Sequence, residues 1–114
     1  MTTINKKDRL SSDSEYHIAK LDGSKTKTLK KFYKKIAPRL EFPDYFGNNL
    51  DGLVDMLSDL TWLEAPNVVI YIKNMEAFLS QENEENRNFV FEIFDEAVAG
   101  QIDEDRKFEV VKVV

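Results

Sequence analysis

Apolar residues form three short runs whose spacing is typical of β-strands. The runs cover residues 15–21, 68–72 and 107–114. Residues 68–72 are continuously apolar, which predicts a central strand covered on both faces by other elements. These runs are expected to form the sheet of the domain.

Between the runs, apolar residues recur every three or four positions, as they do on one face of a helix. The first such segment covers residues 29–37. Thr26 or Thr28 can cap it, and Pro38 is expected to stop it close to Ala37. Lysines occupy its outer side, which predicts a solvated face: Lys27, Lys30, Lys31, Lys34 and Lys35.

Further helices are expected later in the chain. One extends from Asn49 to about Leu60, a short one covers residues 75–79, and a longer one covers residues 89–98 with Gly100 as its C-cap. Strands separated by helices imply parallel crossovers. The predicted fold class is therefore α/β, with a three-stranded parallel sheet flanked by helices.

The length and composition suit a single domain. The chain has 114 residues, 42% of them hydrophobic, and no cysteine, which excludes disulfides and thiolate metal sites. We expect a flexible N-terminal arm at residues 1–13 and the folded domain at residues 14–114. The sequence contains neither an apolar stretch of about 18 residues nor the apolar core of a signal peptide, so we expect no membrane contact and a cytoplasmic location.

Charge is distributed unevenly along the chain. The net charge is −5, but residues 1–41 hold 11 Lys and Arg against 5 Asp and Glu, whereas residues 42–114 hold 5 against 16. An acidic surface of that size attracts basic proteins and repels nucleic acid. We therefore expect a basic protein partner and no direct nucleic-acid binding, although solubility alone is the simpler explanation of the charge by itself.

The second helix carries aspartates on the side opposite its aliphatic residues: Asp51, Asp55 and Asp59, each four residues from the next. Like charges at that spacing repel one another, and Asp is a mediocre helix former. With Asn48 or Asn49 as the cap, the helix dipole favours Asp51, but Asp55 lies mid-helix and has no local explanation. A positively charged partner would supply one.

The turn before this helix holds two aromatic residues and a glycine. Phe46 is expected to pack into the domain, whereas Tyr45 has a polar hydroxyl and suits an interface. Gly47 supplies a backbone conformation or a close approach that a side chain would block. Gly52, inside the helix, lets a partner's backbone come close or is simply tolerated.

Catalytic motifs are absent from the sequence. The single histidine, His17, lies in a predicted strand, no serine sits in a nucleophile-elbow pattern, and the four glycines are too far apart for a phosphate-binding loop. Asp51, Asp55 and Glu96 are the residues that a metal-dependent hydrolase or ion-binding protein would use, but carboxylates along one exposed helix rarely converge on one ion. We expect no enzyme activity, no metal and no cofactor.

Residues 43–55, Pro-Asp-Tyr-Phe-Gly-Asn-Asn-Leu-Asp-Gly-Leu-Val-Asp, resemble the signature of the barstar family of intracellular ribonuclease inhibitors. The resemblance implies a three-stranded parallel sheet flanked by helices. It also implies that Asp55 occupies a phosphate-binding site of the nuclease and that Asp51 faces basic nuclease residues. By the same resemblance, Tyr45 and Gly47 pack on the enzyme and Glu96 is a peripheral acidic contact.

We predict an immunity-type inhibitor of a small basic ribonuclease or ribonuclease-type toxin. It plugs the nuclease active site with the acidic helix and the preceding turn, and it is a monomer when free. Alternatives are an adaptor that binds a basic non-nuclease protein and the metal-dependent hydrolase. Gly52 and Val54 stand where the best-known family member has Ala and Trp, and a contact role for Trp62 is left open. The predicted partner-binding residues are Tyr45, Gly47, Asn49, Asp51, Gly52, Val54, Asp55, Asp59 and Glu96.

Overall fold

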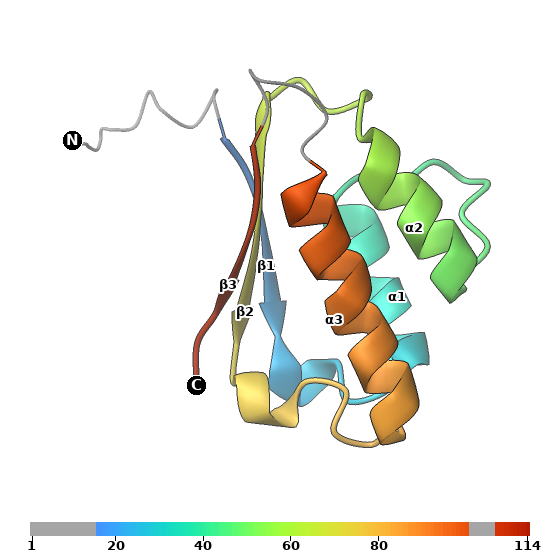
Figure 1. Cartoon of the computed structure of the whole chain (residues 1–114), viewed down its shortest axis with the longest axis vertical. Coiled ribbons are helices and arrows are strands. Elements are labelled where there is room, and N and C mark those ends of the chain that lie inside the picture. The colour runs from blue at the N-terminus through green and yellow to red at the C-terminus, as the bar shows by residue number, and fades with distance from the viewer. Residues whose placement is uncertain (1–15, 101–106) are drawn as a thin grey trace.

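A computed structural model describes residues 16–100 and 107–114 of the chain (Figure 1). The expected N-terminal arm, residues 1–13, lies outside these residues. The elements follow in the order β1 (Tyr16–Asp22), the 3-10 helix η2 (Gly23–Lys25), α1 (Leu29–Arg39), α2 (Leu50–Asp59), β2 (Asn67–Lys73), the 3-10 helix η3 (Met75–Ala77), α3 (Glu84–Ala99) and β3 (Phe108–Lys112).

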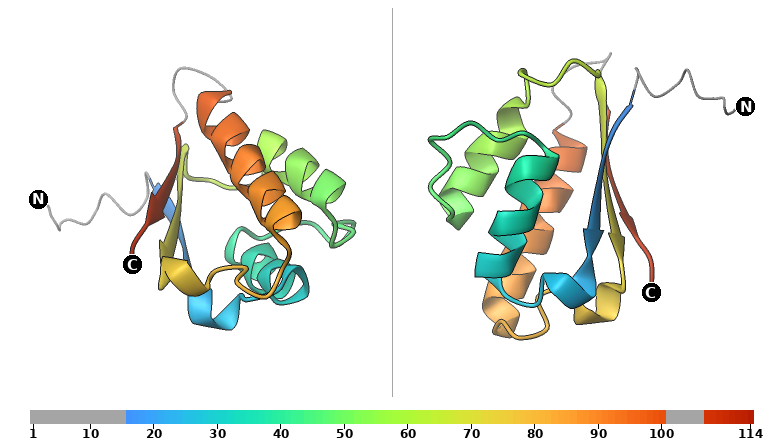
Figure 2. Two further views of the ribbon diagram at one scale, coloured as in Figure 1. Left: turned by 60° about the horizontal axis from the view of Figure 1, so that its bottom comes forward. Right: turned by 180° about the vertical axis from the view of Figure 1, so that it is seen from behind.

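The three strands form one parallel sheet in the order β1-β2-β3, which confirms the predicted fold class. Each crossover adds the next strand in the same direction across the sheet. Because parallel crossovers are right-handed, both crossovers place their helices on the same face. Figures 1 and 2 show α1, α2 and α3 together on one side of the sheet.

The prediction that residues 68–72 are covered on both faces is therefore wrong for the described part of the chain. The side chains of β2 alternate between buried and half-buried positions. Because successive side chains of a strand point to opposite faces, Val69 and Tyr71 lie on the face without helices. On the same face Ile18 is 51% exposed and Val111 is 39% exposed. The sequence does not reveal that one face of the sheet is open, because the residues of β2 on that face are themselves apolar or aromatic.

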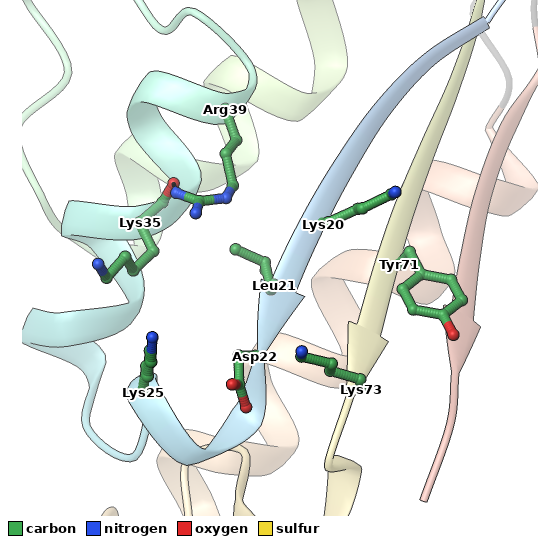
Figure 3. Close-up of a pocket in the computed structure, with 8 residues that line it drawn as sticks. All are labelled: Lys20, Leu21, Asp22, Lys25, Lys35, Arg39, Tyr71 and Lys73. Carbon is green, nitrogen blue, oxygen red and sulfur yellow. Dashed lines mark hydrogen bonds between the residues drawn. The ribbon is translucent and has the colours of Figure 1, made fainter.

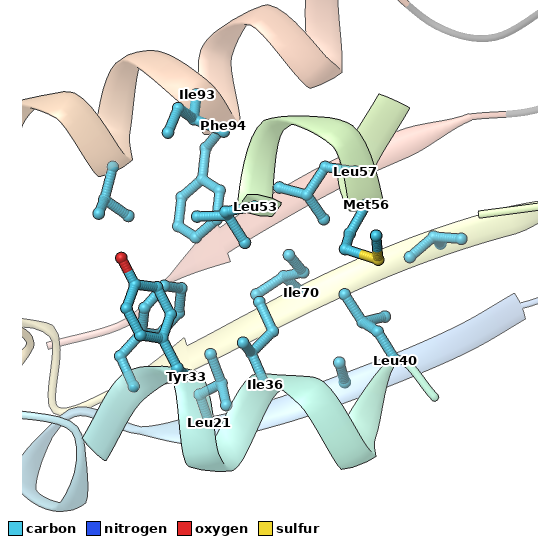
Figure 4. Close-up of a cluster of buried hydrophobic side chains, with 14 of the residues drawn as sticks. Leu21, Tyr33, Ile36, Leu40, Leu53, Met56, Leu57, Ile70, Ile93 and Phe94 are labelled. Carbon is cyan, nitrogen blue, oxygen red and sulfur yellow. The ribbon is translucent and has the colours of Figure 1, made fainter. Parts of the chain in front are cut away.

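The core lies between the sheet and the three helices (Figure 4). Leu21 and Ile70 project from the sheet, and Ile36, Leu53 and Phe94 project from α1, α2 and α3 to meet them. All five are almost completely buried. Each helix thus contributes one apolar stripe to a shared core, as its helical spacing predicts.

Side-chain hydrogen bonds fix both ends of helix α1. Thr28 caps it by accepting a hydrogen bond from the Lys31 amide at 3.2 Å, whereas Thr26 is buried and donates to the Asp22 carbonyl. At the other end, Nε2 of His17 donates to the Arg39 carbonyl at 2.6 Å. His17 is therefore a structural residue that ties β1 to the end of α1.

Helix α1 extends two residues beyond the expected end at Ala37. Pro38 lies inside its last turn, and the Arg39 side chain donates to the Lys35 carbonyl at 3.2 Å. A proline in the last turn removes one backbone donor but leaves little helix beyond it to disturb. Among the described residues, no helix combines the length and apolar composition needed to cross a bilayer.

The carboxyl end of β1 approaches η3 very closely at Gly23. A Cβ atom placed on Gly23 would lie 2.1 Å from the Asn74 carbonyl oxygen and 3.0 Å from the Phe78 amide nitrogen. Both neighbours are backbone atoms, so they cannot rotate away as the end of a side chain can. Only glycine allows the end of β1 and the segment after β2 to lie this close.

We predict that Gly23→Ala lowers the free energy of unfolding by about 1–3 kcal/mol, because the added methyl group must push two backbone segments apart. Urea unfolding followed by far-UV circular dichroism measures the change. Lys30→Ala, at an exposed position of α1, serves as the control and should stay within about 0.5 kcal/mol of the wild type. Equal midpoints for the two variants would contradict the close approach.

Candidate functional site

The turn before α2 sets the direction in which the helix leaves the core. Asn49 is the cap: its side-chain oxygen accepts from the Gly52 amide at 2.6 Å, and its side-chain nitrogen donates to the Gly47 carbonyl at 3.3 Å. The left-handed residue is Asn48, with φ of 53°, and not Gly47, which has a negative φ. Asn tolerates this conformation better than most residues, which explains Asn48.

Gly47 therefore does not provide the unusual backbone conformation that the sequence suggested. It does provide space. A Cβ atom at Gly47 would lie 2.9 Å from the side-chain nitrogen of Asn49 and would disturb the cap of α2. Gly47 is exposed, so the turn presents open backbone to the solvent.

Gly52 has a structural explanation inside the fold. It is half-buried, and a Cβ atom there would lie 3.2 Å from the Phe46 ring. Phe46 packs edge-on against Tyr33 and Phe42, with ring centroids 5.7 Å and 4.9 Å away, so its ring has little freedom to move aside. The prediction that Phe46 packs into the domain is confirmed.

The inner face of α2 is buried and its outer face carries acids. Leu53, Met56 and Leu57 enter the core, whereas Asp51 and Asp55 are exposed. In the described part of the chain, neither carboxylate forms an ion pair or a hydrogen bond. The two negative charges are therefore not neutralised by the lysines and arginines of that part.

The same helix and the turn before it also expose an apolar and an aromatic side chain. Tyr45, in the turn, is 72% exposed, and Val54, between the two acids, is 38% exposed. Large side chains at such exposure gain from burial against a partner. We refer to Tyr45, Asp51, Val54, Asp55 and Glu96 as the acidic surface.

Helix α3 brings Glu96 to the acidic surface. A groove of about 410 Å³ runs between α2 and α3, and Glu96 lines it together with Val54 and Ser58. The other residues that line the groove are Leu57, Ile93, Ala97 and Gly100. The sequence indicated Glu96 as a partner contact only through the family resemblance, and it gave no sign of Ser58 or Ile93. Which two helices lie side by side depends on the tertiary structure.

Asp59 differs from the other two aspartates. Its carboxylate accepts hydrogen bonds from the Thr61 hydroxyl at 2.7 Å and from the Thr61 amide at 3.3 Å. This is a local turn in which an Asp side chain caps the backbone two residues on. The spacing of Asp59 and Thr61 was visible in the sequence, and it gives Asp59 a reason to be present without a partner.

The sequence left open whether Trp62 contacts a partner. The Trp62 ring nitrogen donates to the Leu40 carbonyl at 2.8 Å, and the half-buried ring packs edge-on against Phe42.

Among the described residues, no three Asp, Glu or His side chains come together as a metal-binding group. The metal-dependent alternative built on Asp51, Asp55 and Glu96 thus has no geometric support here.

The fold and the site together define a small α/β domain that presents an exposed acidic helix next to an aromatic turn. The chain belongs to the family described as Barstar (barnase inhibitor), which it matches over residues 16–113. The resemblance found in residues 43–55 is thereby confirmed at the level of the family.

A similar protein from Bacillus subtilis (strain 168) has the name "Putative ribonuclease inhibitor YrdF". The two are 34% identical over 56 residues, which cover 49% of this chain and 58% of that protein. The matched part therefore spans little more than half of the relative's length.

We predict that Asp55→Ala raises the free energy of unfolding of the free protein by a few tenths of a kcal/mol to about 1 kcal/mol. Ala is the better helix former, and the repulsion from Asp51 and Asp59 is removed. Chemical unfolding measures both this variant and Asn49→Ala, which should lose about 1 kcal/mol with the cap. A loss of stability in Asp55→Ala would reveal a structural partner for Asp55 and contradict the acidic surface as described.

Proposed function

We propose that this protein inhibits a small basic ribonuclease by plugging its active site with α2 and the preceding turn. The observation that carries the proposal is the exposed pair Asp51 and Asp55, which has no cation partner in the described part of the chain and a cost in helix stability. Membership of the Barstar family, described by its activity as barnase inhibitor, supports the same partner class.

The chemistry of the proposed complex follows from the substrate of a ribonuclease. RNA is a polyanion, so the cleft that binds it must present Lys, Arg or His side chains to phosphates. The carboxylates of Asp51 and Asp55 lie one helical turn apart and imitate neighbouring negative charges. Asp55, in the middle of the helix, would take the phosphate site, and Asp51 would face the cations beside it.

The neighbouring residues would add contact area and orientation. Tyr45 would pack on the enzyme with its ring and keep its hydroxyl at the rim, and the exposed backbone at Gly47 would allow a close approach. Asn49 and Gly52 would act indirectly, since the first caps α2 and the second lets it pack on Phe46. Val54 and Glu96 would receive a side chain of the enzyme along the groove between α2 and α3.

The inhibitor itself would perform no reaction. Blocking a cleft needs binding alone, and the single histidine of the chain is engaged in a structural hydrogen bond. A role as an immunity-type protein in the cytoplasm, as a monomer when free, is consistent with this mechanism. Asp59 would contribute mainly through its long-range charge, because Thr61 already occupies its carboxylate.

We predict that the wild-type protein blocks RNA cleavage by a small basic ribonuclease of the barnase type and that Asp55→Ala weakens the block by more than tenfold. A charge-assisted hydrogen bond is worth about 1.5–3 kcal/mol, and a factor of ten corresponds to about 1.4 kcal/mol. A fluorogenic RNA substrate measures residual activity as the inhibitor is titrated.

Glu109→Ala is the matched control, since it removes one exposed acid from β3, outside the acidic surface. It should keep the potency of the wild type. Equal potency of all three proteins would contradict the plugging mechanism. Tight binding to a basic protein without any loss of nuclease activity would favour the adaptor instead.

A further inference from the structure

A second charged feature lies at the edge of the sheet. A shallow pocket of about 280 Å³ extends around the carboxyl end of β1, from α1 on the helix side to Tyr71 on the face without helices (Figure 3). Its lining comes from β1, η2, α1 and β2, four elements that the sequence separates widely. The residues that line it are Lys20, Leu21, Asp22, Lys25, Lys35, Arg39, Tyr71 and Lys73. We call this the basic pocket.

Five cations and one carboxylate, that of Asp22, line the basic pocket. That carboxylate already accepts hydrogen bonds from the Ser24 hydroxyl at 2.7 Å, the Ser24 amide at 3.0 Å and the Asn74 side chain at 2.9 Å. These bonds, led by the one from Asn74, lower the pKa of Asp22 to about 2, and Lys73 adds to the effect. Asp22 is thus committed to the junction between β1 and η3.

The remaining cations of the basic pocket have no carboxylate of their own. Within the described residues, no ion pair with an acid is formed by Lys20, Lys25, Lys35 or Arg39. Like charges brought together in one concave site repel one another, and a shallow cleft concentrates their field. A bound anion would relieve that repulsion.

The positive surface continues beyond the basic pocket. A second hollow of about 380 Å³ shares Lys25 and Lys35 with it and adds Ser24, Lys31 and Lys34. No carboxylate lines this hollow, within the residues that the structure describes. The interpretation of the α1 lysines as a merely solvated helix face therefore leaves out that Lys35 also lines the basic pocket, together with residues of β1 and β2.

The size and chemistry of the basic pocket select the class of anion. Its volume is close to the lower end of small-molecule sites, about 300 Å³, and its ammonium groups act as point charges that suit phosphate oxygens. The net charge of the chain is −5, and charges beyond about 8 Å are screened at physiological salt. A compact anion would feel the local cations, whereas a long polyanion would extend into the acidic remainder.

We propose that the basic pocket binds a nucleoside di- or triphosphate through its linked phosphates. The phosphates would lie among Lys25, Lys35 and Arg39 on the helix side of β1. The nucleoside would pass the edge of the sheet, and its base would contact the ring of Tyr71 on the face without helices (Figure 3). The pocket shares no residue with the acidic surface, so this binding is separate from the inhibition of a ribonuclease.

Isothermal titration calorimetry of the full chain with ATP, at constant ionic strength, tests the proposal. We expect saturable binding of one ATP, and binding weaker by more than tenfold in Lys25→Gln/Lys35→Gln, because two charge-assisted contacts are lost. Tripolyphosphate should bind less tightly than ATP, since it lacks a base for Tyr71. Circular dichroism checks that the variants are folded.

Lys30→Gln/Lys107→Gln is the matched control. It removes two exposed cations that line neither the basic pocket nor the second hollow. It should bind ATP as the wild type does. Equal losses in the two double variants would overturn the site in favour of diffuse attraction. Equal affinity for ATP and tripolyphosphate would overturn the nucleoside, and binding of a single-stranded RNA oligomer without binding of ATP would overturn the ligand class.

Discussion

The packing of α2 on the core decides which of its side chains meet the solvent. Leu53, Met56 and Leu57 are buried, and this rotation of the helix leaves Asp51 and Asp55 facing outward. Because the Asn49 cap fixes the start of the helix, the two carboxylates cannot turn toward the lysines of α1 without breaking that cap or uncovering the core. The exposed acids are thus a consequence of the same contacts that stabilise the fold.

Charge segregation gives the molecule two surfaces of opposite sign. The acidic surface belongs to α2, α3 and the turn before α2, whereas the basic pocket belongs to β1, η2, α1 and β2. A mixed distribution would allow cations and anions to pair within the chain. Their separation leaves each set available for ligands of opposite charge, which we propose are a protein on one surface and a phosphate compound on the other.

Much of the fold could be predicted from the sequence, because the spacing of apolar residues within a segment indicates whether it forms a helix or a strand. The strand at residues 68–72, the end of α3 at Gly100 and the parallel order of the sheet all follow from spacing and caps. The one-sided sheet could not be predicted in this way. It depends on the order β1-β2-β3, and a strand with apolar residues at Val69 and Tyr71 looks the same whether or not helices cover both faces.

The candidate site could be predicted in part for similar reasons. Asp55 stands out because it lies mid-helix and is repelled by Asp51 one turn away, and local rules identify such violations of helix preferences well. The role of Gly52 against Phe46 and the groove beside Glu96 depend on contacts between segments far apart in the chain. The engagement of Asp59 with Thr61 is local, and an Asx-turn pattern could have found it.

The central claim is that the exposed carboxylates of α2 are the surface that a ribonuclease covers. The most direct measurement is amide chemical-shift mapping by NMR, with labelled protein titrated by an unlabelled small basic ribonuclease. The account predicts that the largest changes fall on the turn at Tyr45 and Gly47, on Asp51 to Asp55 and near Glu96. Changes confined to the face of the sheet without helices, with α2 unaltered, would contradict it.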